Sequence, residues 1–527
     1  MVADLETRLR LARPAESEPT PEATDRALRA LSRRRRGRAR SAVAWVARTP
    51  RGRLLGVAVL LAAGGTGVAA TLLPGGGGQA PPVDRGAVTA AWGPEFAVAP
   101  VFPRGEFPKP VAVMDTSGAV FVAWSRGRRI EVRRRPPGGP WEPTTRLSGI
   151  GVGTARPQVA FTDGGRAAVV VWRERIGGRV IRRVLRLPDG SVAGVIERRV
   201  GARYVVVARR WSTATGWGPR VQVSADSSGN RRDMADLAVL GRPGGAFLVA
   251  WPNRDRIQTR VLAADGGLTD VQEISPARAG EVADPVLVDR DGSPLLVFAH
   301  RERPVPSHDG TVLAVSADGT GWGRPVEVGA GLVLNERPVV ATRGPRVVVA
   351  WASRSTGTHM GIMVSEQAGG RWSSAARISS PTREAFSPGA GLDRTGTAVV
   401  TWSVGAATQI STRLPAGSWT APTGVSRAGL TGSLSPEANP VASTGDGDLV
   451  LALGARDGIR VADWRGGRLV RSVPAASSTG WQFGYSAIVA APTGSAALLV
   501  TTYRAGRSGI SVIVREPAGL GRDKEGR

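Results

Sequence analysis

The densest cluster of reactive side chains in this sequence is a run of arginines between residues 173 and 203. The middle of the run alternates apolar and basic residues around a Pro-Asp-Gly turn, a pattern typical of a β-hairpin. Guanidinium groups bind carboxylates and phosphates through paired hydrogen bonds, and a dense set of them attracts anions over a distance. We therefore predict an anion-binding hairpin whose contacts come from Arg179, Arg182, Arg183, Arg186, Arg198 and Arg199. The alternative interpretation is that the hairpin is a surface extension whose charge only increases solubility.

Two histidines and a series of acids could extend this site. His308 and His359 fall in loops that we expect on the same side of the molecule as the hairpin. In five repeat units an acid shortly precedes the proline that opens the first strand. If these acids project toward a central channel, they form an acidic ring able to hold a cation; otherwise they only cap loops. The ring would consist of Glu106, Glu281, Glu336, Glu384 and Glu437.

Composition argues against several kinds of chemistry. The chain has 527 residues and no cysteine, which excludes disulfides, thiolate-ligated metals and a thiol nucleophile. No hydrolase, metalloprotease or nucleotide-binding motif stands in a fitting context. We therefore predict no catalytic residue, no metal and no cofactor, and the balance is against an enzyme. The net charge is +27, and almost all of the basic residues are arginine, a bias that GC-rich coding accounts for in part.

The elements that position these residues come from a repeat of about 50 residues. A typical unit begins Pro-x-Val-Ala, turns near an Asp and a Gly, and runs into an apolar strand that ends in Trp. A second strand-rich part ends in Gly-x-Trp and a short strand. Of the 15 tryptophans, 11 occupy these two positions. A tryptophan at a fixed repeat position is most often wedged between neighbouring sheets, so we interpret these as core residues.

Repeats of this length with four short strands are the signature of a β-propeller. The first repeat position recurs eight times, as Trp or as Phe298, Leu453 and Tyr503. The second recurs only seven times after it, and Trp92 near the front supplies the eighth. We therefore predict an all-β, eight-bladed propeller over residues 88–516, with seven blades as the fallback. The Trp92 segment would add the outer strand of the last blade and so close the ring.

The repeat units resemble the sialidase-type, or BNR-like, propeller. The stretch SADGTGW, Ser316 to Trp322, resembles a degenerate Asp-box. The resemblance implies a propeller, and in sialidases it accompanies an arginine triad and a Tyr–Glu nucleophile pair. The Phe-Arg-Ile-Pro motif of that family is missing here. The three tyrosines are Tyr204, Tyr485 and Tyr503, and no Glu can be paired with any of them from the sequence.

The first part of the chain predicts a membrane anchor. Residues 54–73 are 20 uncharged, mostly apolar residues, about the length that crosses a bilayer. Nine arginines and no acid precede them within residues 33–53, which places the N-terminus in the cytoplasm by the positive-inside rule. A cleaved signal peptide is the alternative. Residues 1–53 form a basic cytoplasmic segment, helical in part or disordered; residues 74–87 form a Gly/Pro linker and residues 517–527 a disordered tail.

These observations lead to three hypotheses about function. The first is a single-pass membrane protein with an extracytoplasmic propeller that serves as a non-catalytic binding or scaffold module at the cell envelope. Its partner would be an anionic polymer or a protein, and not a nucleic acid, because the basic domain would lie outside the membrane. The second is a transmembrane sensor or anti-sigma-like regulator with a propeller sensor domain. The third is a sialidase-like glycoside hydrolase. The oligomeric state is open.

Overall fold

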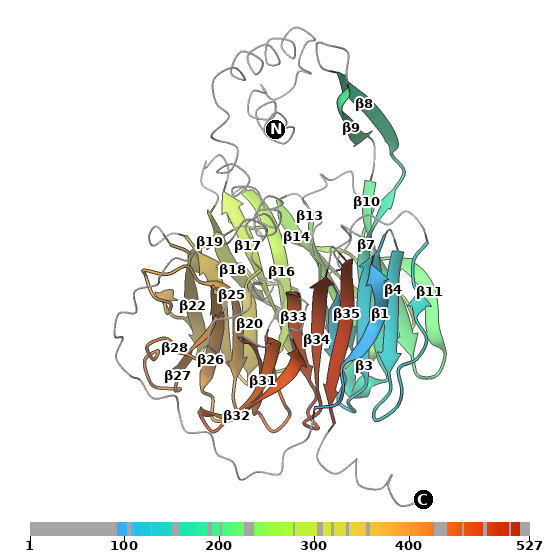
Figure 1. The fold of residues 1–527 in the computed structure, drawn as a ribbon. Helices are drawn as coiled ribbons and strands as arrows, with labels where there is room; N and C mark the ends of the chain where they lie inside the picture. The colour runs from blue at the N-terminus through green and yellow to red at the C-terminus, as the bar shows by residue number, and fades with distance from the viewer. Residues whose placement is uncertain are drawn as a thin grey trace, which may run out of the picture. The chain divides into compact units, whose positions relative to one another are not determined.

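The computed structural model describes residues 92–516 apart from internal gaps, and these residues lie in the second of two structural units, Gly78–Arg527. The gaps are 103–107, 109, 128, 150–156, 187–191, 201–202, 226–236, 254, 278–279, 303–308, 318–320, 334–336, 355–358, 406, 426–439, 456–457, 478–481 and 505–506. The unit is all-β, and its sheets form an eight-bladed propeller (Figure 1). The eight-blade prediction is confirmed, and the seven-blade fallback is not needed.

The first four blades each hold antiparallel strands in chain order, from the inner strand outward. Blade 1 consists of β2 (Val111–Met114), β3 (Val120–Arg126), β4 (Arg129–Arg135) and β5 (Thr145–Arg146). Blade 2 consists of β6 (Gln158–Phe161), β7 (Ala167–Ile176), β10 (Arg203–Ser212) and β11 (Gly216–Gln222). Blade 3 consists of β12 (Ala238–Gly241), β13 (Phe247–Asn253), β14 (Arg256–Leu262) and β15 (Gln272–Ile274). Blade 4 consists of β16 (Gly280–Arg290), β17 (Ser293–Glu302), β18 (Asp309–Ser316) and β19 (Val326–Val333).

Blades 5 to 7 repeat this order, and the outer edge of blade 5 is split into two short strands. Blade 5 consists of β20 (Val339–Arg343), β21 (Arg346–Ser353), β22 (Gly361–Ala368), β23 (Arg371–Trp372) and β24 (Ala376–Arg377). Blade 6 consists of β25 (Phe386–Leu392), β26 (Ala398–Val404), β27 (Ala407–Arg413) and β28 (Thr423–Gly424). Blade 7 consists of β29 (Val441–Ser443), β30 (Leu449–Ala455), β31 (Gly458–Arg465) and β32 (Arg468–Ser477). Two short 3-10 helices, Asp163–Gly165 and Pro243–Gly245, occupy turns of blades 2 and 3.

The last blade joins the two ends of the propeller. Its inner strands are β33 (Gln482–Ala490), β34 (Ala496–Arg504) and β35 (Arg507–Arg515), and its outer strand is β1 (Phe96–Phe102). The pairing of β1 with β35 is antiparallel, and Trp92 forms an isolated bridge with Arg515 (Figure 1, blue beside red). The predicted closure by the Trp92 segment is therefore confirmed. The inner strands contact one another around the complete circle, in the order β2, β6, β12, β16, β20, β25, β29, β33 and again β2.

The hydrophobic core is divided among the blade junctions. Among the described residues, each of the eight junctions holds its own cluster of buried apolar side chains. The tryptophans of the first repeat position lie in these clusters and are almost completely buried: Trp124, Trp172, Trp251, Trp351 and Trp402. Those of the second position are half-buried and pack against the same clusters. A blade alone would expose both faces of its sheet, so closing the ring is what removes these indoles from water.

The buried indole N–H groups also share a hydrogen-bonding pattern, which the repeat pattern does not show directly. Trp124, Trp251 and Trp402 each donate their Nε1–H to a side chain seven residues later, at 3.0 to 3.1 Å. The acceptors are Glu131, Gln258 and Gln409, which are the cross-strand partners of the three tryptophans. A buried indole N–H without an acceptor is costly, and a tight turn between the second and third strands fixes the spacing at seven.

The aspartates in the turns between first and second strands accept hydrogen bonds from backbone amides. Asp115 accepts hydrogen bonds from the amides of Ser117 and Ala119, both at 2.8 Å. Asp393 is completely buried and also accepts the indole N–H of Trp464 from the next blade, at 3.2 Å. The two carboxylates therefore stabilise tight turns through hydrogen bonds to the nearby backbone.

The predicted cytoplasmic segment 1–53, membrane segment 54–73, linker 74–87 and tail 517–527 lie outside the described residues. Within the part of the chain that the structure describes, no helix has the length and apolar character needed to cross a membrane. The anchor and the direction in which it points therefore remain predictions.

Candidate functional site

The alternating strand directions place two sets of loops at the same end of the propeller. In each blade, the connection between the second and third strands and the connection to the next blade leave from that end. We refer to it as the loop face. In blade 2 the connection on this face contains an additional antiparallel hairpin, β8 (Arg179–Arg186) and β9 (Val192–Val200). The predicted hairpin is confirmed, and its predicted Pro-Asp-Gly turn lies outside the described residues.

The hairpin grows from an extended stem. Strands β7 and β10 pair over ten residues each, from Ala167 to Ile176 and from Arg203 to Ser212, and β8–β9 continues beyond them (Figure 1). In the hairpin register, Arg182 is paired with Glu197, whereas Arg179, Arg183, Arg198 and Arg199 are paired with apolar residues. Arg186 is paired with Val192. The two strands therefore carry six arginines and one acid, Glu197.

The base of the hairpin is anchored by charge and by an aromatic ring. Arg173 is buried and its guanidinium carbon lies 4.8 Å from the centre of the Tyr204 ring. Glu174 accepts a hydrogen bond from Arg220 at 3.1 Å. Tyr204 itself is buried in the cluster between blades 2 and 3. This burial gives Tyr204 a packing role and argues against its use as a nucleophile.

The histidines are not gathered into one site. His308 lies outside the described residues. His359 is half-buried on the loop face, where its backbone carbonyl accepts a hydrogen bond from Arg377 at 3.4 Å. The third histidine, His300, lies within β17 and is buried.

The acidic ring is represented by only two of its five predicted members. Glu281 lies on β16 and forms an ion pair with Arg301 of the neighbouring strand. Glu384 is exposed in the connection between blades 5 and 6. The other three, Glu106, Glu336 and Glu437, lie outside the described residues. The carboxylate of Glu281 is thus neutralised within its own blade, and the ring remains a prediction.

No candidate metal site occurs on the described part of the loop face, and the one described acid with a raised pKa lies elsewhere. No group of three or more His, Asp or Glu side chains that could hold a metal ion occurs among the described residues. Asp448 has a pKa above its ordinary value because of burial, and the nearby Asp446 carboxylate adds to that effect. Both acids belong to the turn between β29 and β30, at the end of the propeller opposite the loop face.

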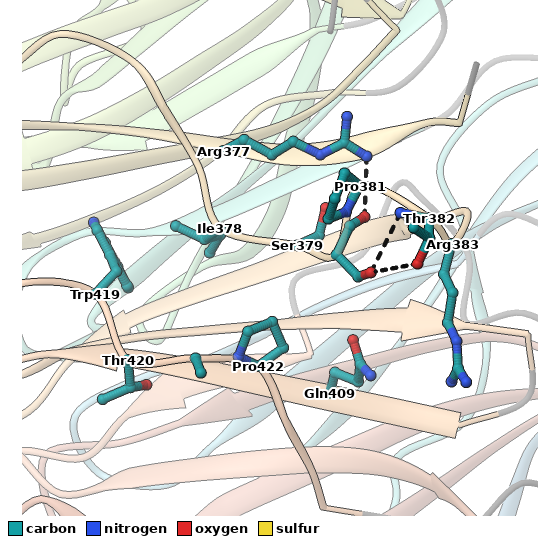
Figure 2. A pocket seen from close by; sticks show the side chains of 12 residues that line it. Arg377, Ile378, Ser379, Pro381, Thr382, Arg383, Gln409, Trp419, Thr420 and Pro422 are labelled. Carbon is teal, nitrogen blue, oxygen red and sulfur yellow. Dashed lines mark hydrogen bonds between the residues drawn. The ribbon is translucent and has the colours of Figure 1, made fainter. Parts of the chain in front are cut away.

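An open groove of about 820 Å³ lies between blades 5 and 6 (Figure 2). Its walls come from β24, from the connection that follows it, from β27 and from the segment 419–422 before β28. Trp419 lines one end and Arg383 the other. No sequence motif marks this groove, because its lining comes from the outer parts of two repeat units.

The resemblance to the sialidase-type propeller is only partly visible in the structure. In the degenerate Asp-box, Trp322 bridges back to Ala317 and donates its indole N–H to Thr259 of the preceding blade at 2.8 Å. The carboxylate of the box, Asp318, lies outside the described residues. The propeller that the resemblance implies is present, and the Asp-box itself stays a prediction.

Comparison with known proteins gives similarity of fold alone. No protein-family model matches the chain, and no curated protein matches it. A protein of unknown function from Dyadobacter fermentans is 11% identical, with 80% of this chain and 99% of that chain covered and a TM-score of 0.39. The polysaccharide lyase Uly1 is 12% identical over 76% of this chain and 88% of its own, with a TM-score of 0.41. The NanB sialidase of Streptococcus pneumoniae is 12% identical over 80% and 70%, with a TM-score of 0.35. Similarity at this level carries no inference about activity.

Proposed function

We propose that this protein is a membrane-anchored, extracytoplasmic β-propeller that binds an anionic polymer at the cell envelope without catalysing a reaction. The observation that carries the proposal is the arginine hairpin β8–β9. Among the described residues, the connection between the second and third strands is extended by two further strands only in blade 2, and this extension carries six arginines against one glutamate and one aspartate.

A projecting basic hairpin is suited to capturing a long polyanion. Its field reaches anions within about 8 Å at physiological salt, and its guanidiniums then make paired contacts with carboxylates or phosphates. The propeller supplies a rigid base, because β7 and β10 are continuous with the blade 2 sheet. The predicted anchor at residues 54–73 would hold the propeller at the envelope.

The test replaces the six hairpin arginines with glutamine in the full chain and measures binding to polygalacturonate and to dextran sulfate. Loss of six positive charges from one projection is expected to weaken binding about 100-fold at low salt, and binding by the unaltered protein is expected to fall steeply as salt is raised. Neutral dextran should bind neither protein.

The matched control removes the same charge elsewhere. Six exposed arginines outside the hairpin are replaced with glutamine: Arg146, Arg166, Arg324, Arg354, Arg371 and Arg507. This variant has the same net charge as the hairpin variant, and it is expected to keep most of the affinity. Equal loss in the two variants would mean that binding follows net charge alone, and would contradict the proposal. So would failure of the unaltered protein to bind either polyanion.

A further inference from the structure

The groove between blades 5 and 6 has an aromatic wall, which is formed by Trp419. Trp419 is half-buried and packs against the core cluster of its junction. The equivalent Trp322 of blade 4 uses its indole N–H to bind Thr259 of the preceding blade. Among the described residues the indole N–H of Trp419 has no such acceptor, and its ring lines the groove (Figure 2).

Two arginines make the groove electropositive. Arg377 donates hydrogen bonds to the carbonyls of His359 and Ser380, at 3.4 and 3.1 Å, so its charge is held in a fixed position. Arg383 is exposed and forms no ion pair with any described acid. None of the lining residues is an Asp or a Glu. An anion is therefore the complementary ligand.

The remaining lining groups are short and polar, and several are already oriented. Gln409 accepts the indole N–H of Trp402 through Oε1 at 3.1 Å, which fixes the amide and turns its NH2 group away from that bond. The hydroxyls of Ser380 and Thr382 are 3.0 Å apart. Thr420 accepts a hydrogen bond from the amide of Thr412 at 3.0 Å. These groups offer donors and acceptors at low entropic cost.

We infer that this groove binds an acidic sugar unit, a saccharide that carries a carboxylate or a sulfate. The apolar face of one sugar ring would pack on Trp419, the saccharide hydroxyls would meet Gln409 and the Ser/Thr hydroxyls, and an anionic group further along the saccharide would meet Arg383. The spread of single hydroxyl and amide groups favours a sugar over a nucleotide, whose base presents a flat edge. For the identity of the polymer this inference rests on the proposed function, which it makes more specific: the anionic polymer is a polysaccharide.

The experiment measures binding of tetragalacturonate and of a heparin tetrasaccharide to the full chain by titration calorimetry. Trp419→Ala and Arg383→Gln are each expected to weaken binding about tenfold, the loss of one stacking contact or one charged contact. Neutral maltotetraose should bind at least about tenfold more weakly than the acidic probes. Arg383→Gln changes an exposed side chain that forms no ion pair with a described acid, so it tests the site without endangering the fold.

Matched controls come from the preceding blade. Trp372 holds the equivalent repeat position and Arg371 is an exposed arginine beside it, and neither lines the groove. Trp372→Ala and Arg371→Gln are expected to leave the affinity for both tetrasaccharides unchanged. If they weaken binding as much as the groove variants do, the site is elsewhere and the inference is wrong.

The remaining outcomes are also decisive. Absence of binding by both tetrasaccharides overturns the inference, as does equal binding by the unaltered protein and Arg383→Gln. Competition by sodium sulfate or adenosine monophosphate at lower concentration than the tetrasaccharides would show a simple anion site or a nucleotide site instead. The hairpin variant should keep its affinity for the tetrasaccharides, whereas the groove variants should keep salt-sensitive binding to long polygalacturonate. Failure of the groove and failure of the hairpin are therefore distinguishable.

Discussion

Replacing Phe102 with alanine is expected to lower the free energy of unfolding by about 4 kcal/mol, because a large side chain is lost from a closed core. Phe102 lies on β1 and is completely buried in the cluster between blades 8 and 1. It contributes to the junction that the N-terminal strand completes, so the cavity would form where the ring is sealed. Urea denaturation of the full chain measures the loss.

The control for Phe102 lies on the same strand. Phe96 is 38% exposed, and its ring stacks on Trp141 with the centroids 5.6 Å apart. Phe96→Ala is expected to cost about 1 kcal/mol, because little apolar area returns to water. Equal losses for the two variants would mean that β1 is only loosely attached to the last blade.

The second large effect is expected for Trp351→Ala, which should lower the free energy of unfolding by about 4 kcal/mol. Trp351 is completely buried between blades 4 and 5, and its indole N–H bonds the carbonyl of Ala330 at 3.3 Å. Its ring fills the space above Gly329, where even an added Cβ would lie 2.5 Å from the ring. The surrounding sheets are therefore too closely fitted to collapse into the space that the ring would leave.

Trp372 is the control for Trp351, because it packs against the same cluster but is half-buried. Trp372→Ala is expected to lower the free energy of unfolding by only about 1 to 2 kcal/mol, because Trp372 buries less apolar area than Trp351 does. Thermal and urea unfolding of both variants check the ranking. Reversal of the order would contradict the assignment of the first repeat position to the blade junctions.

Much of this fold could be predicted from the spacing of tryptophans. A residue at the end of every second strand must face the neighbouring blade, so Phe298 and Leu453 could be recognised as its replacements, and both are completely buried. The same argument identified Trp92 as the missing outer anchor, and it packs against the cluster between blades 7 and 8. The closure followed because the number of anchors had to match the number of blades.

The polar partners of the buried tryptophans were not predicted, although the signal was present. Glu131, Gln258 and Gln409 each follow a repeat tryptophan by seven residues. That spacing corresponds to a cross-strand pair closed by a two-residue turn. Recognising it would have required knowing where each second strand ends.

One of the two candidate sites could be predicted from the sequence, and the other could not. The arginine hairpin is local in sequence, so its alternation and its turn were sufficient to predict it. The groove could not be predicted, because Arg377, Arg383 and Trp419 come from two blades and meet only when the ring places their outer edges together. The acids before the opening prolines share a sequence position, but the pairing of Glu281 with Arg301 depends on the register of β16 and β17.

The most direct test of this account is a disulfide across the seam of the ring. The chain has no cysteine, and Ala97 and Ser511 are partners in the register of β1 and β35. Partners in an antiparallel pair lie about 5 Å apart, within the range that a disulfide spans, whereas Ser508 comes three residues before Ser511 on β35 and lies about 10 Å from Ala97. The account predicts that A97C/S511C forms an intramolecular disulfide on mild oxidation, seen by mass spectrometry and non-reducing electrophoresis, and that A97C/S508C does not. Absence of the bond in A97C/S511C, or equal yield in both variants, would contradict the closure of the propeller by its N-terminal strand.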